Sequence, residues 1–473
     1  MSAPCYGDEN PIAAPATPPG ESALALIRCS GAGSVELLSK VFSRPAKLRS
    51  AGGNSVIHGW IREPRENRGL IDEVLISVYR APRSYTGEEG AEISCHGGTA
   101  AVRAVMETLR AAGFRDSLPG EFSFRAFMNG KLDLTRAESV MELVQTRTDE
   151  GRRRAVARLS GRLREEIAAV KGLLLEILAE AELHLDYDET ELILPGEIGE
   201  GTLPGRKRVE ETLERLRRLA GTWGRERLYQ EGALAVIAGR PNAGKSSLFN
   251  ALLGEDRAIV TEIPGTTRDW IEATISIGGI PLRLADTAGL RGNGEPEPPL
   301  TDRVEQIGVQ KSRELLGQAD LTLYVIDGSR GFLDEDEALL AAPEFQAAPL
   351  FLLWNKADIA PLPPPGGRVF LPLSARTGQG LAELCGAIAG ALEGKPDEGP
   401  GETAALGSGR QKELADKAAA ALEEALNLAD RGEALELIAP CLREAADALG
   451  EITGEVSTAD ILETIFSKFC VGK

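Results

Sequence analysis

The chain has 473 residues, enough for about three domains of ~150 residues each. Hydrophobic residues make up 42% and charged residues 26%, which is ordinary for a globular protein and excludes wholesale disorder, collagen and a disulfide scaffold. With 53 basic and 72 acidic residues the net charge is −19, so any contact with nucleic acid needs a local basic patch.

The sequence shows no targeting or metal signal. No apolar run is long enough to cross a bilayer, and the N-terminus lacks the basic and apolar segments of a signal peptide. Six cysteines without CxxC spacing and only three histidines argue against structural zinc and favour a reducing compartment. We expect a cytoplasmic protein without a membrane span.

Residues 1–131 mix two kinds of pattern. Short β-like runs at Ala23–Ile27 and Val74–Tyr79 alternate with helical stretches such as Ala100–Ala111. This indicates a compact α+β domain.

Residues 132–231 are almost all helix formers, and Ala155–Leu185 predicts one or two long amphipathic helices. From 232 to 395, β-runs that end in glycine or aspartate alternate with helices, which predicts a parallel sheet with crossover helices. A linker rich in Gly, Pro and acidic residues leads into helix again over 396–473. We therefore expect a multidomain α/β and α+β chain, in which a helical domain (132–231 and 396–473) is interrupted by an inserted α/β domain (232–395).

The sharpest motif is GRPNAGKSS at Gly239–Ser247, which fits GxxxxGK[ST] between a strand and a helix. Its backbone N–H groups can cradle phosphates at the helix N-terminus. Lys245 can reach the β- and γ-phosphates, and the Ser246 hydroxyl can ligate Mg²⁺. The bland alternative is a Gly-rich turn.

Three later motifs follow in order: Asp286–Gly289 (DTAG), Asn355–Asp358 (NKAD) and Ser374–Arg376 (SAR). A carboxylate at Asp358 can accept bonds from guanine N1–H and N2–H₂, which adenine does not offer in that pattern. Together these motifs resemble a Ras-like P-loop GTPase, with ATP as the weaker alternative.

Two details of this domain bear on its mechanism. Leu290 follows DTAG where Ras-like enzymes often carry a water-orienting glutamine, so another group must order the water. Thr267 is the expected switch threonine for Mg²⁺, and Arg268 is either a catalytic finger or a solvated surface arginine.

The outer blocks narrow the family. Pro18–Gly20, Ser84–Gly98, Pro119–Leu134 and Gly450–Lys473, with its terminal CVGK, resemble the MnmE (TrmE) family of tRNA modification GTPases across all four blocks. The resemblance implies a homodimer formed through N-terminal domains that bind 5-formyltetrahydrofolate or a related one-carbon folate. It implies a heterocomplex with the flavoprotein MnmG, which adds an aminomethyl or carboxymethylaminomethyl group at C5 of wobble uridine in certain tRNAs. It also implies potassium-dependent GTP hydrolysis activated by G-domain dimerisation.

The resemblance carries over to individual residues. The catalytic residues would be Glu305, which orders the attacking water, and Lys245. Mg²⁺ would be held by Ser246 and Thr267, and K⁺ by Asn242, Thr261, Ile263 and Thr266. Folate would be bound by Arg28, Glu92, Lys131 and Lys473. GTP would be bound by Asn242, Ala243, Gly244, Lys245, Ser246, Ser247, Thr261, Glu262, Ile263, Pro264, Gly265, Thr266, Thr267, Asp286, Thr287, Ala288, Gly289, Asn355, Lys356, Ala357, Asp358, Ser374, Ala375 and Arg376.

Some features depart from the family pattern or allow two interpretations. Gly292–Leu300 lengthens the loop after DTAG. His96 could be catalytic, but we favour a structural role, because a lone histidine lacks a second group to orient it. Cys470 is either inert or a nucleophile. Arg147, Arg154, Arg158 and Arg162 follow helical spacing, and we hypothesise that this stripe, with Arg206–Arg208, faces tRNA or the flavoprotein.

Two other function classes stay open. A ribosome-assembly GTPase would share the G-domain motifs but gives no reason for the SCHGG and FCVGK segments. A non-catalytic nucleotide switch is disfavoured by the presence of Lys245, Ser246, Asp286 and Glu305 together.

Overall fold

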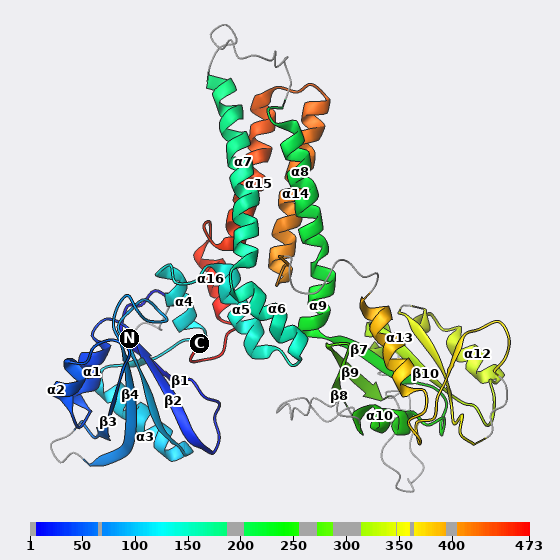
Figure 1. Ribbon diagram of the computed structural model, residues 1–473, viewed down its shortest axis with the longest axis horizontal. Helices are drawn as coiled ribbons and strands as arrows, with labels where there is room; N and C mark the ends of the chain where they lie inside the picture. The colour runs from blue at the N-terminus through cyan, green and yellow to red at the C-terminus, as the bar shows by residue number, and fades with distance from the viewer. Residues whose placement is uncertain are drawn as a thin grey trace, which may run out of the picture. The chain divides into compact units, whose positions relative to one another are not determined.

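The computed structural model describes residues 6–64, 69–186, 203–254, 272–286, 314–346, 348–359, 364–393 and 404–473. The chain forms two compact units, drawn in Figure 1. The first comprises Met1–Met141, Leu159–Arg217 and Glu413–Lys473; the second comprises Glu142–Arg158 and Arg218–Lys412.

The first unit opens with a six-stranded sheet in the order β3-β4-β5-β2-β1-β6. Neighbouring strands are antiparallel except β1 and β6, which are parallel. The strands are β1 (Ile12–Pro15), β2 (Ser22–Ser30), β3 (Ser55–Arg62), β4 (Leu70–Tyr79), β5 (Gly90–Gly97) and β6 (Arg115–Asp116). The helices of this part are α1 (Ser34–Lys40), α2 (Pro45–Arg49), α3 (Thr99–Ala112) and α4 (Glu121–Met128).

Strand alternation gives this sheet two unlike faces. Ala25, Ile27 and Cys29 of β2 point into a core that includes residues of α1 and α3. Arg28 and Ser30 lie on the opposite face, because successive side chains point to opposite sides of the sheet. That second face carries the second candidate site described below.

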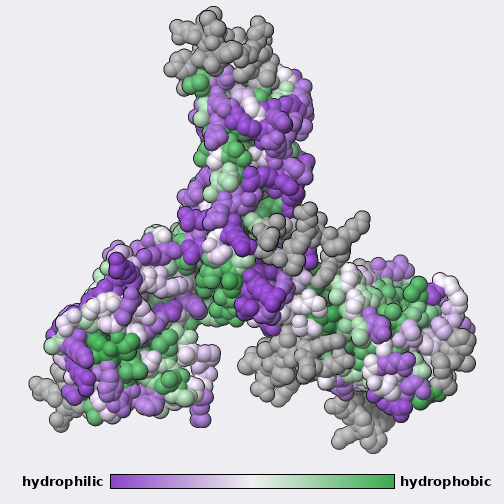
Figure 2. Space-filling model, in the orientation of Figure 1, coloured by the Kyte–Doolittle hydropathy of each residue, from purple (hydrophilic) through white to green (hydrophobic). Residues whose placement is uncertain are grey.

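The rest of the first unit is helical. Its helices are α5 (Leu134–Gln145), α7 (Arg162–Asp186), α8 (Arg206–Gly221), α14 (Gly409–Asp430), α15 (Leu435–Thr453) and α16 (Ala459–Phe466), with the ends of α5, α8 and α14 crossing into the second unit. Helices α7 and α15 pack along each other, and ion pairs such as Arg215–Glu166 join α8 to α7. The surface of these helices is largely hydrophilic (Figure 2), and within the described ranges no helix has the length and apolarity of a membrane span.

The second unit contains a six-stranded sheet in the order β12-β11-β10-β7-β9-β8. All neighbours are parallel except β8 and β9, which form a hairpin. The strands are β7 (Ala233–Ala238), β8 (Glu272–Ile277), β9 (Ile280–Asp286), β10 (Leu321–Asp327), β11 (Leu350–Asn355) and β12 (Phe370–Pro372). The helices are α6 (Asp149–Leu159), α9 (Trp223–Glu231), α10 (Lys245–Gly254), α12 (Asp334–Leu340) and α13 (Leu381–Glu393), with a 3₁₀ turn at Pro343–Phe345.

Every residue of β7 and β10 is buried, because apolar cores cover both faces of the sheet. The predicted fold class, an α+β domain with a helical domain and an inserted P-loop α/β domain, is confirmed. Ala155–Leu185 forms two helices rather than one. They are separated at Gly161, whose φ of +102° lies in the left-handed region.

The proposed basic stripe is wrong for Arg154 and Arg158. The Arg158 side chain is only 4% exposed and Arg154 only 11%, because both arginines form ion pairs where α6 meets α9 and, for Arg158, also with Glu142 of α5. Glu226 of α9 pairs with both, at 2.7 Å from Arg158, and the Arg154 guanidinium lies 4.0 Å from the centre of the Tyr229 ring. These two side chains hold helices together and do not form an exposed surface for nucleic acid.

Candidate functional site

The nucleotide-binding candidates gather at the carboxyl ends of the parallel strands of the second unit. The loop Gly239–Gly244 joins buried β7 to α10. A Cβ on Gly239 would lie 2.3 Å from the Val325 carbonyl oxygen, and one on Gly244 would lie 2.2 Å from Asn355 Nδ2. Only glycine fits these two positions, which have φ values of +135° and +101°.

Lys245 lies at the start of α10 and is buried. Its Nζ donates to the Gly239 and Arg240 carbonyl oxygens, each at 2.9 Å, so the ammonium group is folded back over the loop. A helix N-terminus with a lysine at this position attracts phosphate oxygens through its backbone N–H groups and its charge.

Ser246 and Asp286 meet beside this loop. The Ser246 hydroxyl donates to the Asp286 carboxylate at 2.8 Å, and Asp286, at the end of β9, is only 3% exposed. Hydroxyl and carboxylate oxygens are ligands that Mg²⁺ accepts. The two residues therefore fit a magnesium site beside the phosphate loop.

The NKAD and SAR segments lie together at the ends of β11 and β12. Asn355 Nδ2 donates to the Ala243 carbonyl at 2.8 Å, and its Oδ1 accepts from the Ala375 N–H at 3.0 Å, so it fastens the phosphate loop to the SAR turn. Asp358 accepts from the Ser374 hydroxyl at 2.7 Å and from Arg376 at 2.6 Å. The Ser374 hydrogen bond is the main cause that lowers the pKa of Asp358, which keeps its carboxylate ionised and able to accept from a base.

The structure thus brings one group of predicted residues to the same edge of the sheet, namely Asn242, Ala243, Gly244, Lys245, Ser246, Ser247, Asp286, Asn355, Lys356, Ala357, Asp358, Ser374, Ala375 and Arg376. The other predicted members lie outside the described residues: Thr261, Glu262, Ile263, Pro264, Gly265, Thr266, Thr267, Thr287, Ala288, Gly289 and Glu305. Arg268, Leu290 and the Gly292–Leu300 loop also lie outside them.

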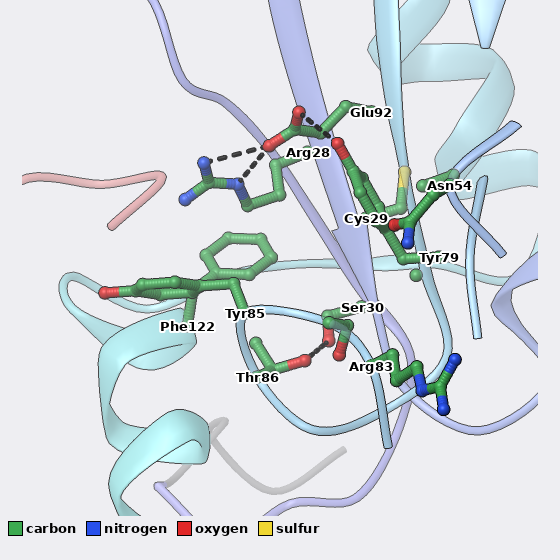
Figure 3. A pocket seen from close by; sticks show the side chains of 13 residues that line it. Arg28, Cys29, Ser30, Asn54, Tyr79, Arg83, Tyr85, Thr86, Glu92 and Phe122 are labelled. Carbon is green, nitrogen blue, oxygen red and sulfur yellow. Dashed lines mark hydrogen bonds and ion pairs between the residues drawn. The ribbon is translucent and has the colours of Figure 1, made fainter. Parts of the chain in front are cut away.

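A second candidate site is a cavity of about 370 Å³ in the first unit, on the face of the sheet opposite α3 (Figure 3). Arg28 and Glu92 face each other across β2 and β5, with Arg28 Nη2 at 2.9 Å and Nε at 3.0 Å from Glu92 Oε1. The Tyr79 hydroxyl donates to the other Glu92 oxygen at 3.2 Å. Burial, followed by the Glu92 charge, raises the pKa of Tyr79, so this hydroxyl stays protonated.

The chain's C-terminal residues reach this cavity. Arg28 Nη1 donates to the Gly472 carbonyl at 3.1 Å, and the Phe122 N–H donates to the Lys473 carbonyl at 3.2 Å. A Cβ on Gly472 would lie 2.4 Å from the Pro15 carbonyl oxygen, so the tail passes tightly over the end of β1. Burial, followed by the nearby Arg28 charge, lowers the pKa of the Lys473 ammonium group.

The four predicted folate residues differ in their positions. Arg28 and Glu92 line the cavity. Lys473 follows Gly472, the residue whose carbonyl accepts from Arg28, and its own carbonyl accepts from the Phe122 N–H. Lys131 packs against the turn at Gly87, one residue beyond the cavity wall at Thr86.

The reason given for a structural His96 is wrong. His96 Nδ1 lies 2.6 Å from Asp72 Oδ1, and its backbone N–H donates to the other Asp72 oxygen at 2.8 Å, so a carboxylate does orient the ring. The Asp72 hydrogen bond raises the pKa of His96. The side chain is 65% exposed on the open face of the sheet.

Sequence reasoning missed other residues of both sites. Asp327 at the end of β10 accepts from Lys356 Nζ at 2.6 Å, and Arg240 of the phosphate loop donates to Asp336, which is fully buried, at 2.8 Å. Strand alternation from Arg28 would have found Ser30 in the cavity. No sequence signal distinguishes Asp336 from the other acids at the start of α12.

Two family models match the segments of the chain that contain the two candidate sites. The model described as "GTP-binding protein TrmE N-terminus" matches residues 11–131, and the MnmE helical domain model matches residues 134–470. A tRNA modification GTPase MnmE of Treponema denticola is 41% identical, covering 99% of each chain. The chain belongs to the MnmE family. The MnmE of Carboxydothermus hydrogenoformans is 42% identical over 98% of this chain and all of that one.

Membership of the MnmE family confirms the resemblance found in the sequence. The TrmE N-terminal match contains Arg28 and Glu92, and the MnmE helical match contains the inserted GTPase sheet with its phosphate loop. Both candidate sites therefore lie within segments that the MnmE family shares.

Proposed function

We propose that this MnmE-family chain hydrolyses GTP and acts in tRNA modification. The observation that carries the GTPase assignment is the joining of the phosphate loop to the base-reading segment through Asn355 and its two hydrogen bonds. The curated relatives that carry the name tRNA modification GTPase MnmE support the tRNA substrate.

GTP hydrolysis would use charges at the phosphate loop and one group that orders water. Lys245 would turn from the loop carbonyls to the β- and γ-phosphates. Ser246 and Thr267 would hold Mg²⁺, which would supply positive charge to the phosphate oxygens. The family resemblance assigns the ordering of the attacking water to Glu305, a role for which Leu290 has no polar group. Asp358 selects guanine.

Potassium is the proposed second cation, held by Asn242, Thr261, Ile263 and Thr266 when two G domains meet. A neutral amide oxygen, backbone carbonyls and phosphate oxygens form an oxygen cage that suits a large monovalent ion. Hydrolysis should be faster in K⁺ than in Na⁺ at equal ionic strength, and Asn242→Ala should lose roughly a hundredfold of the K⁺-stimulated rate. Equal wild-type rates in the two salts would contradict the potassium site. Glu305→Ala should slow hydrolysis but keep the K⁺-driven dimerisation.

The cavity beside Arg28 is the proposed site for 5-formyltetrahydrofolate or a related one-carbon folate, bound by Arg28, Glu92, Lys131 and Lys473. A pterin ring has an N–H and an amino group on one edge, and these are partners for the Glu92 carboxylate. The positive charges of Arg28 and the two lysines suit the folate's carboxylates and ring carbonyl.

The proposed assembly is a homodimer that works with the flavoprotein MnmG to add an aminomethyl or carboxymethylaminomethyl group at C5 of wobble uridine. Leu24, Val56 and Leu75 support dimerisation through the N-terminal domains, because they are 65%, 63% and 48% exposed on the open face of that sheet. The domain bounds 1–131, 132–231, 232–395 and 396–473 remain proposals, and the cytoplasmic location remains a prediction.

Mass spectrometry of wobble nucleosides tests the whole assignment. A strain that lacks this chain should lose the modified uridine, the wild-type gene should restore it, and the Lys245→Ala gene should not. Normal nucleosides in the deletion strain, together with association of the chain with ribosomes, would favour the ribosome-assembly alternative. Restoration by the Lys245→Ala gene would favour the non-catalytic switch.

A further inference from the structure

Two hydroxyl groups form part of the cavity wall beyond Arg28. Ser30 and Thr86 line the cavity and are 2% and 3% exposed, and their oxygens lie 2.6 Å apart (Figure 3). At that distance one hydroxyl donates to the other, and the pair alone leaves the direction open.

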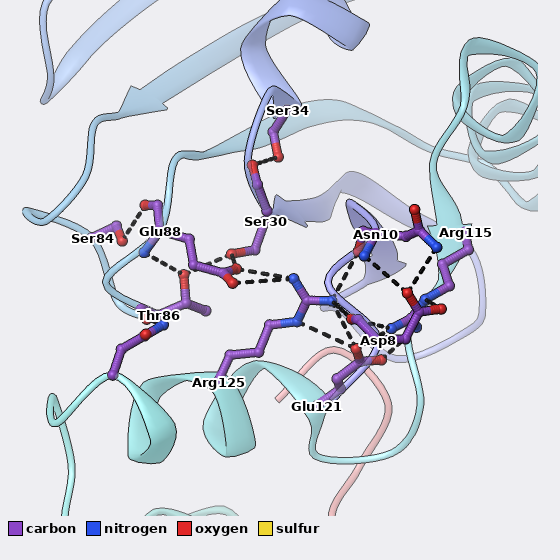
Figure 4. A network of polar contacts seen from close by, with 12 residues as sticks. Asp8, Asn10, Ser30, Ser34, Ser84, Thr86, Glu88, Arg115, Glu121 and Arg125 are labelled. Carbon is purple, nitrogen blue, oxygen red and sulfur yellow. Dashed lines mark hydrogen bonds and ion pairs between the residues drawn. The ribbon is translucent and has the colours of Figure 1, made fainter. Parts of the chain in front are cut away.

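Glu88 settles the direction. Its Oε2 lies 2.8 Å from the Ser30 oxygen, and both of its oxygens accept from Arg125 Nη1, at 3.1 and 3.3 Å (Figure 4). A carboxylate paired with a guanidinium is ionised and can only accept hydrogen bonds. Ser30 therefore donates its one proton to Glu88, and Thr86 must donate to Ser30.

Arg125 is held firmly in place. Its side chain is 6% exposed, and Nη2 donates to Glu121 Oε1 at 2.9 Å and to the backbone carbonyls of Asp8 and Asn10 at 2.8 and 2.9 Å. The Glu88 N–H in turn donates to the Thr86 oxygen at 3.3 Å. Both hydroxyl protons are thus used inside the wall, and only oxygen lone pairs remain to face the cavity.

We infer that Ser30 and Thr86 form an acceptor-only wall that selects ligands with an N–H donor at this place, with Glu88 and Arg125 as its positioning residues. The inference rests on the proposed folate function. Ser30 lies two residues along β2 from Arg28 on the same face, about 6.6 Å away. A fused two-ring ligand with one edge at the Arg28–Glu92 pair thus brings its other ring to these hydroxyls.

This wall distinguishes the oxidation states of a folate. In a tetrahydrofolate the second ring carries N–H groups, whereas in fully oxidised folic acid the same ring nitrogens present lone pairs. A lone pair against an acceptor-only wall leaves both groups without a partner, and buried sites strongly reject such analogues. The wall therefore favours the reduced form.

Calorimetry on the full chain tests this, with tetrahydrofolate and folic acid as the two probes. The wild type should bind tetrahydrofolate at least about tenfold more tightly. In Glu88→Gln the amide oxygen faces Arg125 and the amide nitrogen donates to Ser30, which frees a hydroxyl proton for the cavity. The preference for tetrahydrofolate should then fall by about tenfold. Ser30→Ala should act in the same direction, because Thr86 loses its acceptor.

Ser34→Ala is the matched control. Ser34 is fully buried near the same strand end and donates to the Gly31 carbonyl at 2.5 Å, but it does not line the cavity, so the preference should not change. The two probes also differ in ring shape, but that difference is common to all variants and cancels when their preferences are compared. Equal wild-type affinities, or an unchanged preference in Glu88→Gln, would overturn the wall while leaving the folate site standing. Binding of neither probe by the wild type would instead refute the proposed folate function, and the inference with it.

Discussion

The ion-pair cluster among α5, α6 and α9 should respond unequally to loss of an acid and loss of a base. Its buried and half-buried members are three carboxylates (Glu142, Glu150, Glu226) and two guanidinium groups (Arg154, Arg158), hence one excess negative charge among them. The exposed Arg153 guanidinium reaches Glu150 only from the solvent side, at 3.8 Å. Glu226→Gln removes that excess and leaves Arg158 paired with Glu142. Arg158→Met leaves three buried or half-buried carboxylates with a single arginine.

The magnitudes follow from burial. The side chains of Arg158, Glu226 and Glu142 are 4%, 5% and 9% exposed, so water screens them little. Removing one partner of a buried pair costs about 3–5 kcal/mol when the other is left unpaired, and we expect that range for Arg158→Met. Glu226→Gln keeps hydrogen-bonding capacity and should cost about 1–2 kcal/mol.

The pH dependence gives a second measurement. Burial is the largest of the effects on Glu142 and raises its pKa even with Arg158 present. An acid whose folded pKa is raised binds more protons in the folded state, so stability falls as pH rises from the unfolded pKa through the folded one. The deficit of Arg158→Met relative to the wild type should therefore shrink as pH is lowered from 7 towards 4.5.

Urea unfolding of the full chain measures the stability loss of each variant and its dependence on pH. Because a chain with two units does not unfold in one step, hydrogen exchange of β7 is used to follow the second unit alone. Lys417→Met, which removes an exposed ion pair with Glu444, should change stability by less than about 1 kcal/mol. If Glu226→Gln destabilises as much as Arg158→Met, the charge-excess reasoning is refuted.

Three further outcomes are expected. Asp358→Asn should weaken GTP binding by roughly a hundredfold, about tenfold for each of two hydrogen bonds to the charged carboxylate, and should move the preference towards XTP. Nucleotide titration checks this, and Asp327→Asn is expected to leave the GTP/XTP preference unchanged. Deleting Cys470–Lys473 should abolish folate binding and leave GTP hydrolysis intact, and retained calorimetric affinity would remove the tail from the site. The His96 pKa, followed by NMR, should lie above 6.5 and return towards that value in Asp72→Asn. The stabilisation from the His96–Asp72 pair is present at low pH and is lost as pH rises through the raised pKa. An unaltered His96 titration in Asp72→Asn would disprove the pairing.

The inserted domain was predictable because its signals are local. A buried β-run, a glycine loop and a helix start follow one another within about twenty residues, so β7, the loop and α10 could be found without tertiary information. The β8–β9 hairpin was not predicted, since its first strand, Glu272–Ile277, comes before a recognised motif and has no signal of its own.

The contacts that define the cavity could not be predicted in the same way. Arg28 meets Glu92 and Gly472 across 64 and 444 residues, and no local pattern encodes such distances. Family resemblance supplied the residue names but not their arrangement. The arginine spacing on α6 led to the wrong prediction of an exposed basic surface. A helical stripe of like charges has the same spacing whether it faces water or carboxylates on a neighbouring helix.

The hydrogen bond from Arg28 to Gly472 also bears on how the protein is made. A ribosome finishes the six strands of the first sheet within the first 116 residues, but the Gly472 carbonyl that accepts from Arg28 is added only at position 472. A chain stalled within the inserted domain has all six strands of this sheet but lacks the acceptor at Gly472 for the Arg28 guanidinium. The Arg28 side chain therefore has its full set of hydrogen-bond partners only after Gly472 has been synthesised.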